Sequence, residues 1–98
     1  MATSNNDEYR KKTFTGRATF GSNKTIPRDW TAIYIRNSAT STGNATIRFY
    51  QSTTDLTIYN DAILEPGEIY NDTPQSGLSF AILITPASGC IVDYRYQL

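Results

Sequence analysis

The chain has 98 residues, with nine basic side chains, nine acidic side chains and no histidine, so its formal net charge is zero. This balance argues against a general nucleic-acid binder, and the length matches one small domain that often gains stability by assembling with copies of itself. No stretch approaches the roughly 18 apolar residues of a membrane span, and the N-terminus lacks the apolar run of a secretory signal. We therefore expect synthesis in the cytoplasm and exit, if any, within a larger particle or by lysis.

Residues 1–11 are polar and charged and have no periodicity, so we expect a flexible N-terminal arm before a single domain over residues 12–98. Arg10, Lys11 and Lys12 form a basic cluster where the arm meets the domain. Two interpretations remain open, which are solvated charge and a contact with an acidic partner surface. Three charges are too few to predict a nucleic-acid site.

Alternation of apolar and polar residues predicts the first strand over residues 13–20, in which Gly16 marks a bulge or a close approach. Residues 30–51 contain two segments rich in β-branched and aromatic residues around the small polar loop 38–43, which predicts a hairpin. Because side chains alternate across a strand, we expect one face of this hairpin in the core, packed against a facing sheet. The inward set is Ile33, Ile35, Ile47 and Phe49, and the facing set is Phe80, Ile82 and Ile84.

Further strands are predicted at residues 56–60, with Leu56 and Ile58 inward, and at 68–70, after a Pro-Gly turn. Residues 78–85 are apolar on both faces, which is typical of a central strand, and with residues 90–98 they predict a second hairpin. About seven or eight strands without a helical period indicate an all-β fold. We expect a single antiparallel β-sandwich or small barrel, of the jelly-roll or immunoglobulin-like type.

The sequence lacks most of the residue combinations that enzymes use for catalysis. Without histidine there is no Ser-His or Cys-His pair and no imidazole metal ligand, and the lone Cys90 can form neither an intrachain disulfide nor a zinc site. We expect Cys90 to be a small core residue, and we expect no enzyme activity, no cofactor and no metal. Paired carboxylates for glycosidase chemistry, or a calcium site, are the alternatives to charged loops at one end of a sandwich. Those carboxylates are Asp55, Asp61, Glu65, Glu68 and Asp72.

Charge is distributed unevenly along the chain. Six of the nine basic residues occur by position 28, and five of the nine acidic residues lie between positions 55 and 72. If the two regions lie apart in the fold, the domain has a positive and a negative patch and can pack head to tail with copies of itself or on a charged scaffold. If they lie together, they pair within the monomer.

Aromatic residues at outward positions are the other candidate contact surface. Trp30, Tyr34, Tyr50, Tyr59, Tyr94 and Tyr96 fall opposite the apolar face of their strands. Such side chains cover strand edges, form protein interfaces or stack on sugars, and all three uses stay open. The predicted partner-binding residues are Arg10, Lys11, Lys12, Arg17, Trp30, Tyr34, Tyr50 and Tyr59.

The chain combines a polar arm and Thr- and Tyr-rich strands with two further segments, Ile-Leu-Glu-Pro-Gly-Glu at 63–68 and Ile-Thr-Pro-Ala-Ser-Gly-Cys-Ile-Val at 84–92. In this combination it resembles the small all-β accessory proteins of tailed-phage virions. Those proteins decorate heads or form the base of spikes and fibres. The resemblance implies a non-enzymatic structural protein of the virion that binds capsid or tail subunits, often as a homo-oligomer, with the arm on a neighbour. A carbohydrate-binding or host-surface-binding β-sandwich is the alternative, and we expect neither a nucleic-acid nor a membrane partner.

Overall fold

The computed structural model describes residues 12–74 and 79–98, and these residues form eight strands. No helix in the described ranges is long and apolar enough to cross a membrane. In chain order the strands are β1 (Thr13–Thr19), β2 (Lys24–Ile26), β3 (Ala32–Asn37), β4 (Ala45–Tyr50), β5 (Ile58–Leu64), β6 (Ile69–Asp72), β7 (Ala81–Pro86) and β8 (Ile91–Gln97).

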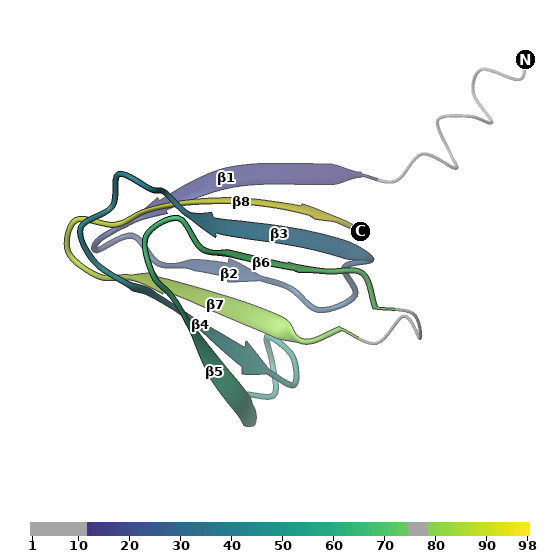
Figure 1. Ribbon diagram of the computed structural model, residues 1–98. Coiled ribbons are helices and arrows are strands. Elements are labelled where there is room, and N and C mark those ends of the chain that lie inside the picture. Colours follow the sequence, from purple (N-terminus) through teal and green to yellow (C-terminus); the bar gives the residue numbers. More distant parts are fainter. Residues whose placement is uncertain (1–11, 75–78) are drawn as a thin grey trace, which may run out of the picture.

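The strands form two four-stranded antiparallel sheets, which lie one over the other (Figure 1). The β1 sheet has the order β1-β8-β3-β6, and the β2 sheet has the order β2-β7-β4-β5. Successive strands therefore alternate between the sheets, except that β4 and β5 are neighbours. Two interleaved Greek keys of eight strands make a jelly roll, so the all-β sandwich prediction is confirmed.

Both predicted hairpins are wrong, although the strands themselves are present. β3 pairs with β6 and β8, while β4 pairs with β5 and β7, so the segment after Asn37 crosses from one sheet to the other. β7 and β8 are separated in the same way. A polar connection of a few residues can span either a hairpin or the roughly 10 Å between packed sheets, and strand alternation looks the same in both cases.

The core lies between the inner faces of the two sheets. Ile33 and Ile35 of β3 point inward from the β1 sheet, as predicted. Ile47 and Phe49 do not face Ile84 and Ile82 across the core, because they pair with them side by side within the β2 sheet. β7 lies between β2 and β4, which confirms its prediction as a central strand. Phe80, predicted to face the hairpin, precedes β7 and is partly exposed.

Three aromatic residues predicted to point outward lie on the core side instead. Trp30 is 2% exposed, and its Nε1 donates a hydrogen bond of 2.8 Å to the carbonyl of Phe80. Trp30 precedes β3, so the alternation of that strand does not govern its direction. Tyr94 and Tyr96 share the inner face of β8 with Val92, and they pack against the core where a glycine, Gly16, leaves space.

Two local predictions are confirmed at the ends of strands. Gly67 has φ +89° in the turn between β5 and β6, where the amide of Glu68 donates to the carbonyl of Glu65 over 2.9 Å. This is the Pro-Gly turn that the sequence predicts. Cys90 is buried, and its thiol donates to the carbonyl of Asn44 at 3.2 Å.

Candidate interaction surfaces

The acidic residues of positions 55–72 do not converge on one point. Asp61 on β5 accepts two hydrogen bonds from Arg48 on β4, of 2.7 and 2.8 Å. This guanidinium holds the pKa of the Asp61 carboxyl below its usual range, chiefly through the hydrogen bond. Within residues 12–74 and 79–98, no three acidic or cysteine side chains lie close enough together to hold a metal ion. The described carboxylates therefore do not gather into a cluster of three that could hold a metal ion.

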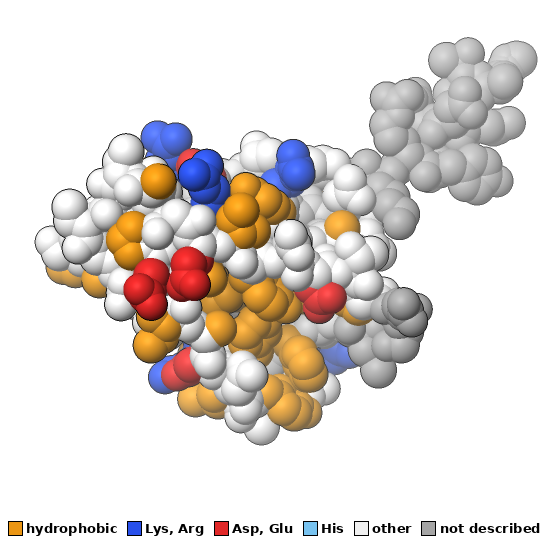
Figure 2. Space-filling model, in the orientation of Figure 1, with side chains coloured by type: hydrophobic (Ala, Val, Ile, Leu, Met, Phe, Trp, Pro, Cys, Tyr) orange, Lys and Arg blue, Asp and Glu red, His pale blue; other side chains and the backbone are white. Residues whose placement is uncertain are grey.

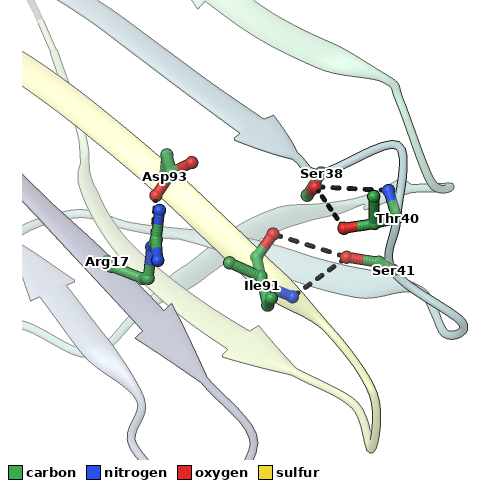
Figure 3. A network of polar contacts seen from close by, with 6 residues as sticks. All are labelled: Arg17, Ser38, Thr40, Ser41, Ile91 and Asp93. Atoms are coloured by element: carbon green, nitrogen blue, oxygen red, sulfur yellow. Dashed lines mark hydrogen bonds and ion pairs between the residues drawn. The ribbon is translucent and has the colours of Figure 1, made fainter.

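The predicted basic contact residues divide into three groups. Arg10 and Lys11 lie outside the described residues, and Lys12 is exposed immediately before β1. Arg17, on the outer face of the β1 sheet, binds Asp93 of the neighbouring strand β8, with 2.8 Å between Nε and Oδ1 (Figure 3). The Arg17 side chain remains 63% exposed, so this surface pair leaves it accessible to a partner.

The loop after β3, residues 38–44, is attached to β8. The amide of Ile91 donates to the Ser41 hydroxyl over 2.9 Å (Figure 3). The amide of Ser38 donates to the Ile91 carbonyl over the same distance. Ser38 and Thr40 also join their hydroxyls at 2.9 Å. These bonds hold the loop against the sheet, so it is not a free tip that reaches outward.

The predicted aromatic contact residues do not form one surface. Trp30 is in the core, so its predicted outward position is wrong, while its role in contacting a partner stays a prediction. Tyr34 lies on the outer face of the β1 sheet, with the Arg95 guanidinium 5.5 Å from the centre of its ring. Tyr50 lies on the outer face of the β2 sheet, half-buried next to Arg48. Tyr59, on β5, is 54% exposed and is the predicted aromatic that lies among a group of exposed apolar side chains.

The surface that this group forms lies at the side of the sandwich where β5 and β6 are the edge strands. We call it the apolar edge, and its large exposed side chains are Leu56, Ile58, Tyr59, Ile63, Ile69 and Phe80. Figure 2 shows hydrophobic side chains between β6 and β5 and over β5, with acidic side chains beside them. The side chain of Ile63, for example, is 62% exposed. Such a concentration of apolar surface at one side of a small domain is typical of an interface.

A hollow of about 270 Å³ opens at the apolar edge between the sheets. Tyr59 and Phe80 form one rim, with ring centres 4.5 Å apart, and Trp30 and Phe49 lie at its floor. Tyr70 forms another wall, and burial together with the nearby Asp72 carboxylate raises its pKa to about 12. The hollow is therefore lined mainly by aromatic rings, with Asp72 as the acidic side chain among its lining residues.

A second, larger hollow of about 770 Å³ lies at the end of the β1 sheet. It is bordered by Tyr34, Asn71, Arg95 and Gln97, which are the planar polar and aromatic side chains that commonly contact sugars. Of the predicted site residues, Tyr34 is the one that the structure places here.

Sequence reasoning missed the aliphatic part of the apolar edge. Leu56 and Ile58 were expected to point inward, which is wrong, because Leu56 precedes β5 and Ile58 lies at its free end beside a register shift in the β4–β5 pairing. One signal was available in the sequence. Ala62, Ile63 and Leu64 are consecutive, and in a strand the middle one of three must point away from its neighbours.

No protein-family model and no curated protein matches this chain. Solved structures with a similar fold include a de novo designed double-stranded β-helix (TM-score 0.52, 14% identity, covering 88% of this chain and 96% of the other). PirA is also similar (TM-score 0.54, 11% identity, 88% and 93% covered). A further neighbour is a Bacillus endospore appendage that forms disulfide-linked pili (TM-score 0.49, 17% identity, 91% of each chain covered).

At these identities the likeness concerns the fold alone. The chain is a small all-β domain with jelly-roll topology, and its most distinctive surface is the apolar edge.

Proposed function

We propose that this protein is a non-enzymatic structural component of an assembled particle, of the head-decoration or cement type found on phage virions. In this role it binds capsid or tail subunits and stabilises the particle. The observation that carries the proposal is the apolar edge, where four large hydrophobic side chains are exposed on the edge strands β5 and β6 and two more, Leu56 and Phe80, are exposed just before β5 and β7. Removing apolar surface from water is favourable by about 25 cal/mol for each Å². A partner that covers these side chains therefore gains binding free energy in proportion to the apolar area that it buries.

The shape of the apolar edge favours a protein partner. The exposed aliphatic residues Ile58, Ile63 and Ile69 offer no hydrogen bonds to a sugar. On the same side of the sandwich, the aromatic hollow is open to a side chain of a partner. Aromatic and aliphatic anchors in a central pocket are the usual source of binding energy in protein interfaces. The edge strands β5 and β6 also present free backbone groups beside them.

The test is co-sedimentation of the purified protein with assembled phage heads or tails. We expect wild-type protein to pellet with the particles. The Ile63→Ser variant should lose at least about tenfold in affinity, because truncating a hot-spot residue costs about 2 kcal/mol or more and a tenfold loss corresponds to about 1.4 kcal/mol. Leu98→Ser is the matched control, since Leu98 is 41% exposed but lies at the C-terminus and outside the apolar edge. Equal binding of Ile63→Ser and wild type would remove the apolar edge from the mechanism.

A carbohydrate-binding role is the second candidate, and the hollow beside Tyr34 favours it. Tyr34 supplies an aromatic face, while Asn71, Arg95 and Gln97 supply donors and acceptors around it. A glycan array followed by NMR titration tests this role. Chemical-shift changes at Tyr34 and Arg95 that vanish in Tyr34→Ala but persist in Tyr50→Ala would support it, and an array without binding would exclude it.

A further inference from the structure

The two sides of the sandwich carry opposite charge. β1 and β2 are the edge strands of one side, and Lys12, Arg17 and Lys24 lie on them or immediately beside them. β5 and β6 are the edge strands of the other side, and the five acidic residues of positions 55–72 lie on them or in their connecting loops. The sequence left open whether these two groups lie apart or pair within the monomer. The strand order places the described basic residues Lys12, Arg17 and Lys24 on the side opposite the acidic residues.

Ion pairs in the described part of the chain do not join the two sides. Arg17 pairs with Asp93 on β8, Arg28 pairs with its neighbour Asp29, and Arg48 pairs with Asp61 within the β2 sheet. Each of these pairs is local to one side or one sheet, so the separation of charge is not cancelled across the domain.

The basic side also carries exposed apolar side chains. Phe20, in the turn between β1 and β2, is 67% exposed, and Phe14 on β1 is 38% exposed and stacks on Tyr96 at 5.1 Å. We call this side the basic edge, defined by Lys12, Phe14, Arg17, Phe20 and Lys24. It thus offers both an opposite charge and hydrophobic contacts to the apolar edge.

The free strand edges have matching lengths. β1 and β5 have seven residues each, and each pairs with a neighbour on one side only among the described strands. The other two edge strands, β2 and β6, have three and four residues. Long edge strands with free N–H and C=O groups are templates for pairing with another chain unless a partner covers them.

We infer that the apolar edge receives the basic edge of a second copy of this chain, so that copies join side by side in a continuing array. This inference rests on the proposed function, because it names the partner of the same surface. A two-fold contact of the apolar edge with itself would bring Glu65 and Asp72 against their own copies, and like charges oppose it. A head-to-tail contact places Glu65 and Asp72 near the lysines at the two ends of the basic edge, Lys12 and Lys24, and leaves a free edge at each end of the array.

Charge-swap variants test the arrangement by sedimentation velocity over a concentration series without any particle. Wild-type protein should self-associate, and more weakly at about 500 mM than at about 50 mM salt, because salt screens exposed charges. Glu65→Lys with Asp72→Lys places basic side chains at the proposed contact positions of both edges, and Lys12→Glu with Lys24→Glu places acidic side chains at those positions of both edges. Each variant alone should lose at least about tenfold in association. An equimolar mixture of the two should regain it, because unlike edges then meet again.

Other outcomes overturn the inference. Wild-type protein that stays monomeric at its solubility limit excludes self-association, and acidic and basic variants that associate as well as wild type exclude a head-to-tail contact. Circular dichroism and thermal melting verify that each variant is folded, and the neutral pair Glu65→Gln with Asp72→Asn replaces the lysine variant if that one does not fold. Monomeric protein that still binds particles through Ile63 would leave the proposed function standing. Self-association without particle binding would leave this inference standing and remove the function.

Discussion

The side-chain amide of Asn37 on β3 donates a hydrogen bond of 2.9 Å to the carbonyl of Leu64, at the end of β5 in the opposite sheet. The same Nδ2 donates to the carbonyl of Gly43 over 3.0 Å, and Asn37 is fully buried. Its backbone carbonyl accepts from Gly67, in the turn that follows Leu64. One residue therefore joins the two sheets, the crossing loop and the turn between the edge strands of the apolar edge.

Asn37→Ala should lower the free energy of unfolding by about 1–3 kcal/mol, because two buried carbonyls lose their side-chain donor. Urea denaturation followed by tryptophan fluorescence measures this change, since Trp30 is in the core. Asn44→Ala is the matched control, because Asn44 is an exposed asparagine in the same loop. Equal stability of the two variants would show that the Asn37 amide is dispensable.

Ile82→Asp should unfold the domain, because Ile82 is fully buried on the central strand β7 and a carboxylate there has no partner. The milder Ile82→Ala should fold and lose about 2–5 kcal/mol. Thr85→Asp, three residues along on the exposed face of β7, should melt like wild type. A soluble Ile82→Asp variant with a cooperative melt would contradict the placement of this side chain.

Gly16→Ala should destabilise the domain, because a Cβ at this position collides with the phenol ring of Tyr94 on β8. Overpacking of this kind typically costs about 1–3 kcal/mol. The double variant Gly16→Ala with Tyr94→Ala removes the collision, so the two substitutions should be less costly together than the sum of their separate effects. Additive effects in this double-mutant cycle would mean that the glycine serves another purpose.

Strand content could be predicted from the sequence because alternation is a local property of each segment. Ile33, Ile35 and Ile47 lie inward as their strands predict. Pairing could not be predicted, since a crossing connection and a hairpin have the same polar composition, and the choice depends on which long-range partners compete for each edge. β3 gains two partners, β6 and β8, by leaving β4.

The candidate site was less accessible to prediction than the fold. Trp30 lies outside its strand, where alternation has no meaning, and its indole reaches the Phe80 carbonyl across the core. Ile58 and Ile69 look like core residues in the sequence, and their exposure follows from their place on edge strands, which only the topology defines. The uneven distribution of charge was visible along the sequence. Whether the acidic and basic segments lie on the same side of the domain or on opposite sides could be decided only from the strand order.

Acid should weaken the domain partly through Asp61. Arg48 lowers the folded-state pKa of Asp61, so the unfolded chain, in which an aspartate titrates near about 3.9, binds the proton more readily. The stabilisation that ionised Asp61 gives to the folded state is therefore present above about pH 5. It disappears as the pH falls through the folded-state pKa of Asp61. Asp61→Asn should be less stable than wild type at pH 7, and the difference should shrink towards about pH 3. Arg48→Gln should show the same profile, and a gap that is independent of pH would contradict the linkage.

Alkali should weaken the domain through Tyr70, and here the sign is reversed. Burial, together with Asp72, raises the pKa of Tyr70 to about 12, whereas a tyrosine in an unfolded chain titrates near about 10. The unfolded state therefore loses its proton first, so stability is fully present below about pH 10 and falls as the pH rises towards the folded-state value.

Tyr70→Phe keeps the ring, whose centre lies 5.4 Å from that of Phe49, and removes the ionisable hydroxyl. The variant should therefore lose less stability than wild type between pH 7 and about pH 11, as measured by urea denaturation at each pH. Burial also raises the pKa of Tyr96, so part of the alkaline loss should persist in the variant and disappear further in Tyr70→Phe with Tyr96→Phe. Parallel stability curves for Tyr70→Phe and wild type would show that the Tyr70 hydroxyl ionises as easily in the folded domain as in the unfolded chain, and hence that the hollow at the apolar edge is open to water.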